Sequence, residues 1–204
     1  MVHSPAPIPS FSDAVQFHGH TCPGLALGYR VAIIALEELR SDPSHDEELV
    51  AIVENDACGI DAIQVVTGCT AGKGNLIFRD YGKHVYTLIN RRNGKAVRVA
   101  TKPTFSTASL DPAFGDLRTK AMSGSATAEE KEQFEKHRDA VCHAILTIPY
   151  HNIFSVQHID VQVPVLATIY KSVPCECCGE LVSGHRVVTV SGKTLCIPCS
   201  AKKE

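Results

Sequence analysis

The chain has 204 residues and 44% hydrophobic content, which suits one moderate packed domain with a small appendage. Its formal net charge is −2 with acidic and basic residues intermixed, so no strong positive field exists to gather nucleic acid or an anionic membrane. No apolar stretch reaches the roughly 20 residues that span a bilayer, and the polar, proline-rich start lacks the features of a signal peptide. We therefore expect a cytoplasmic protein with neither a membrane nor a nucleic acid as partner.

The first part of the chain predicts a buried helix, a strand and a second helix. Residues 23–40 begin with Pro23, which suits the first position of a helix, and carry apolar side chains on nearly every side. Residues 49–54 alternate as a strand does, and residues 59–67 have a helical pattern that begins just past Cys58. A cysteine is thus expected between the end of a strand and the start of a helix.

The rest of the first 165 residues predicts a sheet and one more helix. The expected strands are residues 76–80, 85–90, 96–101 and 156–163. Asn93-Gly94 is a strong hairpin signal between two of them, and Thr127 with Glu130 forms a capping-box pattern ahead of a helix to about residue 146. We expect an α+β fold with a mainly antiparallel sheet and packed helices in residues 1–165, followed by a small domain in residues 166–204.

The carboxy-terminal segment carries two Cys-x2-Cys pairs, at a separation typical of a four-thiolate zinc site. The pairs are formed by Cys175, Cys178, Cys196 and Cys199. Cys177 is expected to be a bystander, because a Cys-x-Cys pair with Cys175 would be unusual. The segment is too small to bury enough apolar surface alone, so zinc would supply its folding free energy. Four thiolates leave no open coordination position, so the predicted role of this zinc is structural.

A second group of ligand types precedes the first buried helix. His18, His20 and Cys22 alternate, so an extended backbone would point all three side chains to the same side. Cys22 stands at about the N-cap of the helix, where backbone N–H groups are expected to lower the pKa of its thiol. Cys58 repeats this arrangement at the next helix, and Cys69 follows the end of that helix.

Each of these residues alone is more simply a buried cysteine or a capping histidine. The His-x-His-x-Cys cluster as a unit favours a metal site or a reactive thiol, because suitable ligand types and alternation coincide. Cys142, on a late helix, is expected to be a core thiol instead.

The glycine-rich loop of residues 68–75 invites comparison with a phosphate-binding loop. The match fails, because Gly74 replaces the hydroxyl residue that would hold magnesium and because the loop follows a helix instead of a strand. Lys73 is still a candidate for binding an anion, or a pterin-like or methanofuran-like cofactor. Alternatively, Gly72 and Gly74 serve only the turn.

The sequence resembles the FmdE family of formylmethanofuran dehydrogenase proteins at residues 17–24, 55–64 and 67–75. The carboxy-terminal cysteines resemble the treble-clef zinc finger that some members carry. The resemblance implies an α+β core that commonly forms a homodimer, and an association with other subunits of the molybdenum or tungsten enzyme that reduces carbon dioxide onto methanofuran in methanogenesis. It does not imply that this chain catalyses that reaction, since the repeated cysteine runs of an iron–sulfur protein are missing.

Carried onto this chain, the family motif places a candidate site at His18, His20, Cys22, Cys58 and Cys69, with Asp56, Asp61 and Lys73 nearby. All five of the first group are candidate ligands of a second transition metal. Cys22, His20 and Cys58 are the candidate catalytic residues, with Cys22 as a nucleophile or the ion as an electrophile. Which of these residues bind together stays open at this point.

Two hypotheses of function follow. In the first, the chain is a metal-binding protein with an enzymatic or accessory role in one-carbon or molybdopterin-linked metabolism, as an oxidoreductase subunit or its accessory. In the second, it is a non-enzymatic regulatory or interaction protein whose zinc finger docks a protein or nucleic-acid partner. Nucleic acid is the weaker form of the second hypothesis, because the finger offers few cationic side chains.

Overall fold

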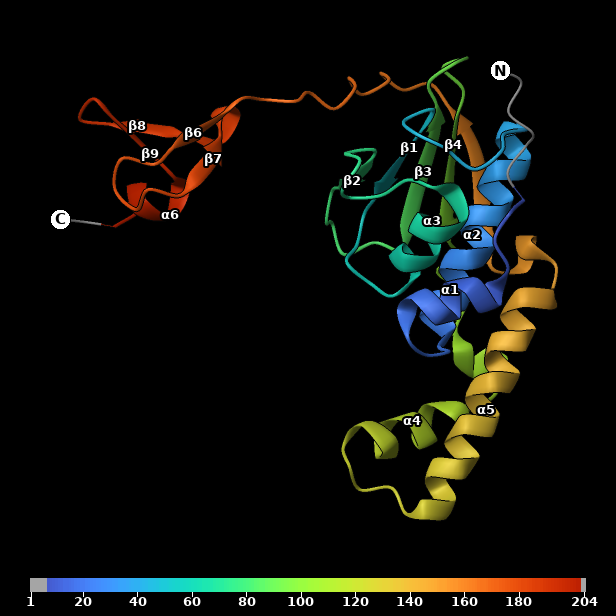
Figure 1. The fold of residues 1–204 in the computed structure, drawn as a ribbon. Coiled ribbons are helices and arrows are strands. Elements are labelled where there is room, and N and C mark those ends of the chain that lie inside the picture. The colour runs from blue at the N-terminus through green and yellow to red at the C-terminus, as the bar shows by residue number, and fades with distance from the viewer. Residues whose placement is uncertain (1–6, 203–204) are drawn as a thin grey trace. The chain divides into compact units, whose positions relative to one another are not determined.

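The computed structural model describes residues 7–202, which divide into two compact units between Leu166 and Ala167. The first unit is the α+β domain with strands β1 to β5, and the second unit contains strands β6 to β9 (Figure 1). The second unit also holds the four clustered cysteines. No helix within residues 7–202 combines the length and the apolar character needed to cross a membrane.

A five-stranded sheet forms the centre of the first unit, with strand order β2-β1-β3-β4-β5. Its strands are β1 (Leu49–Val53), β2 (Leu76–Phe78), β3 (Val85–Asn90), β4 (Ala96–Thr101) and β5 (Phe154–Ile159). β1 pairs with β2 in parallel, and all other pairs are antiparallel. The prediction of an α+β fold with a mainly antiparallel sheet is confirmed.

Most helices of this unit gather on one side of the sheet, whereas α4 (Phe114–Met122) lies beyond the end of the sheet beside α5 (Ala128–Thr147) (Figure 1). The other helices are α1 (Phe11–His18), α2 (Pro23–Leu39) and α3 (Gly59–Thr67). α2 lies at the centre, because it packs against β3 and β4 and also against α1, α3 and α5. This position explains why α2 has so few polar residues: Leu25, Val31 and Ala35 are all completely buried.

The two faces of the sheet are both covered, as the alternation of side chains along β1 shows. Leu49, Ala51 and Val53 join the main core with the helices. Val50 and Ile52 point to the opposite face, where the segment after β5 packs Val161 and Val163 against them.

Most predicted elements match the structure to within three residues, and the differences have local causes. The expected strand 156–163 is observed as β5 at 154–159, because the chain after Ile159 leaves the sheet pairing and crosses the second face. Thr127 and Glu130 form the predicted capping box of α5. The helices α1 and α4 were not predicted, since each is short and α4 carries little apolar pattern.

The second unit consists of two hairpins and a short helix. β6 (Ser172–Pro174) pairs with β7 (Leu181–Ser183), and β8 (Val188–Val190) pairs with β9 (Lys193–Leu195). The helix α6 (Ile197–Ser200) begins directly after Cys196. A knuckle turn, a hairpin and a helix that together carry four cysteines form the zinc-finger arrangement that the sequence predicted.

Candidate metal sites

The four finger cysteines come together in the second unit. The sulfurs of Cys175, Cys178, Cys196 and Cys199 all lie within 4.8 Å of one another. The Sγ atoms of Cys178 and Cys196 are 3.9 Å apart, close to the roughly 3.8 Å that a tetrahedral ion with Zn–S bonds imposes. Cys177 is exposed and is not one of these four clustered cysteines.

Backbone N–H groups donate to the sulfurs of two of these residues, Cys175 and Cys196. The N–H of Cys196 donates to Sγ of Cys175 at 3.2 Å, and the N–H of Cys199 donates to Sγ of Cys196 at 3.4 Å. The N–H of Cys178 and then that of Cys196 lower the pKa of Cys175 to about 6. The donor set, the spacing and the N–H pattern therefore fit a structural zinc ion.

The core candidate site is built where α1 ends and α2 begins. Ser10 starts α1 with a capping box, and Gly19 ends it in the left-handed region at φ 91°. Cys22 is the N-cap of α2, where its Sγ accepts the N–H of Leu25 at 3.3 Å. The expectation of an extended backbone from His18 to Cys22 is wrong at its start, because His18 is the last residue of a helix.

The turn at Gly19 nevertheless brings the three predicted ligands together. One ligand atom each of His18, His20 and Cys22 lies within 4.8 Å of the other two. Nε2 of His18 is 3.8 Å from Sγ of Cys22, and the two imidazole rings are 4.5 Å apart between centroids. Neighbouring N and S ligands of a tetrahedral ion lie roughly 3.6 Å apart, so this geometry fits a transition-metal ion with little adjustment.

Cys58 lies beside this group at the N-cap of α3. A Cβ placed on Gly24 would be 3.3 Å from Cβ of Cys58 and 3.9 Å from the sulfurs of both Cys22 and Cys58. Gly24 therefore leaves the space in which the two thiols approach each other. Cys58 is exposed and Cys22 is half-buried, so the pair faces the surface.

Asn55 positions the turn that carries Cys58, a role that sequence reasoning missed. Its Oδ1 accepts the N–H of Ala57 at 3.1 Å, and its Nδ2 donates to the carbonyl of Lys83 at 2.8 Å. The hydroxyl of Tyr86 lies against it, 3.5 Å from Oδ1. An asparagine between a strand and a helix start is a turn signal that could have indicated this role.

The pKa of Cys22 differs from the expectation. Burial raises it, the N–H of Leu25 opposes that effect, and the neighbouring Cys58 raises the pKa further. The predicted lowering of the pKa by the helix N-terminus is therefore outweighed, because the N–H groups of Leu25 and Gly24 compensate less than desolvation costs.

The structure does not bring Cys69 to the other candidate ligands. Cys69 follows the opposite end of α3 from Cys58, roughly 15 Å away by the rise of a helix. It is completely buried among apolar side chains, and burial raises the pKa of its thiol to about 11. This environment is that of a core residue. Cys142 is likewise buried, as expected for a core thiol.

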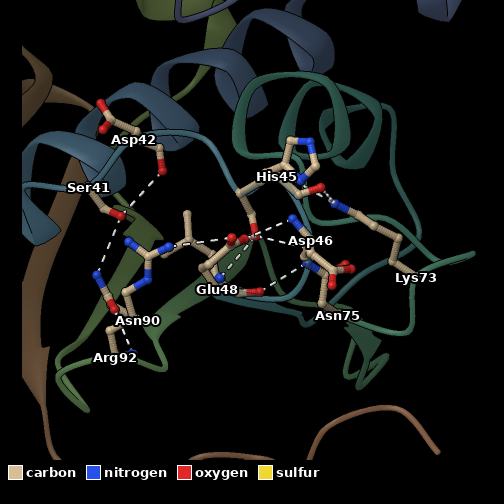
Figure 2. Close-up of polar contacts among 11 residues, drawn as sticks. Ser41, Asp42, His45, Asp46, Glu48, Lys73, Asn75, Asn90 and Arg92 are labelled. Carbon is tan, nitrogen blue, oxygen red and sulfur yellow. Dashed lines mark hydrogen bonds and ion pairs between the residues drawn. The ribbon is translucent and has the colours of Figure 1, made fainter. Parts of the chain in front are cut away.

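Lys73 also lies at this far end of α3, where it ties two loops together (Figure 2). Its Nζ lies 3.4 Å from the carbonyl of Ser44 and 3.2 Å from that of His45. Asn75 joins the same contact by donating to the carbonyls of Asp46 at 3.1 Å and Leu49 at 3.0 Å. The ammonium group thus serves the packing of the loops, and the cofactor role predicted for it gains no support from these contacts.

The fold and the two cysteine-rich clusters define an α+β protein with a metal-binding C4 finger. The family model described as "FmdE, Molybdenum formylmethanofuran dehydrogenase operon" matches residues 17–155, and the chain belongs to this family. A prokaryotic dksA/traR C4-type zinc finger matches residues 169–204.

Two relatives extend this comparison. A tungsten formylmethanofuran dehydrogenase FmdE-like protein from Syntrophus aciditrophicus has the same fold, with a TM-score of 0.59 at 22% identity over 98% of this chain and 97% of that one. A protein of Archaeoglobus fulgidus, described as "Probable S-adenosyl-L-methionine-binding protein", is 34% identical over 92% of this chain. This chain covers 51% of that relative's length, which is about half.

Proposed function

We propose that this chain is a metal-binding subunit or accessory protein of a molybdenum or tungsten formylmethanofuran dehydrogenase, with a second metal site in its core. The observation that carries the proposal is the convergence of His18, His20 and Cys22 within 4.8 Å, beside Cys58. Two nitrogens and one or two sulfurs form a ligand set suited to zinc or a similar transition metal.

The site has the chemistry of an exposed metal centre. A bound cation would favour the thiolate of Cys22 and so oppose the effect of burial on its pKa. His18, His20 and Cys22 would hold the ion; Cys58 would close the site as a fourth ligand, whereas a solvent molecule in its place would leave a Lewis acid. The first arrangement suits a structural or delivery role and the second suits catalysis.

The association with the dehydrogenase rests on the family to which the chain belongs. It is tested by mixing the full chain, as the homodimer we also propose, with the catalytic subunits of a formylmethanofuran dehydrogenase and measuring the mass of the complex by light scattering. A stable complex supports the proposal. If the chain keeps its core metal but forms no complex, the association with the dehydrogenase is wrong and the core metal site still stands.

A second candidate function is binding of S-adenosyl-L-methionine, which the description of the Archaeoglobus relative favours. Isothermal titration calorimetry of the full chain with this compound tests it directly. Saturable heat that disappears in a Cys22→Ser variant would place the ligand at the core cluster. Absence of heat at millimolar ligand removes this candidate.

A further inference from the structure

Asp61 on α3 is joined to the core cluster through His18. Nδ1 of His18 lies 2.6 Å from Oδ2 of Asp61, and 11% of the histidine side chain is exposed. A carboxylate only accepts hydrogen bonds, so this contact requires a proton on Nδ1. The lone pair of a neutral His18 is then on Nε2, the atom that faces Sγ of Cys22 at 3.8 Å.

Asp61 is itself held in place by its neighbour one turn along α3. Gln64 donates through Nε2 to Oδ1 of Asp61 at 3.3 Å, which leaves Oδ2 for the histidine. The side-chain oxygen of Gln64 accepts the N–H of Ala71 at 3.4 Å. A single row of contacts therefore runs from the loop of residues 68–75 through Gln64 and Asp61 to the imidazole of His18.

We infer that Asp61 is a positioning residue that fixes the tautomer and orientation of His18 so that Nε2 is the metal-binding atom, with Gln64 anchoring the carboxylate to the glycine-rich loop. The inference rests on the core metal site of the proposed function. A carboxylate behind a ligating histidine raises the basicity of the imidazole, and its loss weakens metal binding about 10–100-fold in comparable sites.

The inference also gives the loop of residues 68–75 a role that does not involve phosphate or a cofactor. Gly68 adopts φ 70°, and a side chain on it would lie 2.2 Å from the carbonyl of Ser44. The loop is thus fixed against the 41–48 segment and offers Ala71 as a rigid partner for Gln64. Its effect on the metal site is indirect and passes through α3.

The test is a Co²⁺ titration of the full chain with zinc already bound in the finger, with a chelator as competitor. The signal is the charge-transfer absorption from thiolate to cobalt. The part of it that is absent in the Cys22→Ser variant reports the core site. We expect Asp61→Ala to weaken Co²⁺ binding about 10–100-fold, with Asp61→Asn in between because its amide oxygen still accepts the Nδ1 proton. Asp116→Ala, which removes an exposed first-turn carboxylate from α4, is the matched control and should bind as the wild type does.

Asp61 could also affect metal binding merely by stabilising the fold. The tautomer of His18 in the metal-free chain, measured by ¹⁵N NMR of the imidazole, distinguishes the two roles. The wild type should show the proton on Nδ1, and Asp61→Ala should show a mixture. Equal Co²⁺ affinity in the wild type and Asp61→Ala, or an unchanged tautomer, overturns the inference and leaves the metal site standing. A wild type without a Cys22-dependent signal overturns the proposed metal site and the inference together.

Discussion

Gly28 of α2 and Gly59 of α3 meet backbone to backbone. A Cβ on Gly28 would lie 2.1 Å from the carbonyl oxygen of Gly59 and 2.4 Å from its Cα. This contact brings the start of α3 against α2, and with it the thiol of Cys58 to the thiol of Cys22. The absence of two side chains thus sets the spacing of the core cluster.

Gly28→Ala is expected to destabilise the core domain by about 3 kcal/mol or to prevent folding, because the atoms it would overlap belong to the backbone and cannot rotate away. Chemical denaturation of the full chain measures the loss. The matched control is Gly72→Ala, where an added Cβ has no atom within 4 Å. Equal stability of the two variants would show that the helices separate more easily than the packing suggests.

Glu48 makes the stability of the core domain depend on pH. Burial would raise its pKa, but the N–H groups of Asp46 and of Glu48 itself, the hydroxyl of Ser44 and then Arg92 outweigh burial and lower the pKa to about 2 (Figure 2). Because the pKa of Glu48 is lower in the folded state, its carboxylate stabilises the fold at pH values above 4.5, the pKa in the unfolded chain. This stabilisation is lost as the pH falls from 4.5 toward 2.

Glu48→Gln should therefore cost about 1 kcal/mol at pH 7, a figure reduced for the partial exposure of the carboxylate. Measured by urea denaturation, the difference from the wild type should shrink between pH 4.5 and pH 2. Glu132→Gln is the control, since it removes an exposed carboxylate paired with Lys136 and should change little at any pH. A difference for Glu48→Gln that does not vary with pH would contradict this account.

Removal of one finger ligand should affect the second unit alone. Cys178→Ser is expected to lower zinc affinity at least tenfold and to abolish the dispersed amide signals of the finger, since metal supplies its folding free energy. The thermal transition of the core domain should persist. Cys177→Ser should keep a full equivalent of zinc, and loss of zinc from this variant would place Cys177 among the ligands.

Lys73→Met tests the structural role of the lysine. We expect a loss of about 1 kcal/mol in the stability of the core domain, because two backbone carbonyls lose their cationic partner, and no change in metal content. Lys95→Met, at an exposed turn, is the control in the same denaturation experiment. A variant of wild-type stability that no longer binds an anionic cofactor would instead support the cofactor role predicted from the sequence.

The sequence predicted the parts of the fold that have strong local signals. The Asn93-Gly94 hairpin, Pro23 at the start of α2 and the capping box of Thr127 and Glu130 each determine an element through a few neighbouring residues. The eight-residue α1 begins with a capping box of Ser10 and Asp13, but the helix is short and its end at His18 depends on the left-handed turn at Gly19. Short helices that are fixed by caps and tertiary packing are difficult to predict from periodicity.

The grouping of the candidate ligands also depends on tertiary packing and could be predicted only in part from the sequence. His18, His20 and Cys22 come together because they are close in the chain, and Cys58 joins them because α2 and α3 pack closely. Cys69 has the same chemistry and a similar setting beside a helix, yet α3 separates it from Cys58. Side-chain type and local spacing therefore indicated the cluster, and only the packing of helices could select its members.

The most direct test of the core metal site is the metal content of the purified full chain, measured by inductively coupled plasma mass spectrometry. Two equivalents per chain are expected in the wild type and in Cys69→Ala. One equivalent is expected in Cys22→Ala and in His20→Ala, with the remaining ion in the finger. A single equivalent in all four proteins would contradict the core metal site and leave the finger as the metal-binding part.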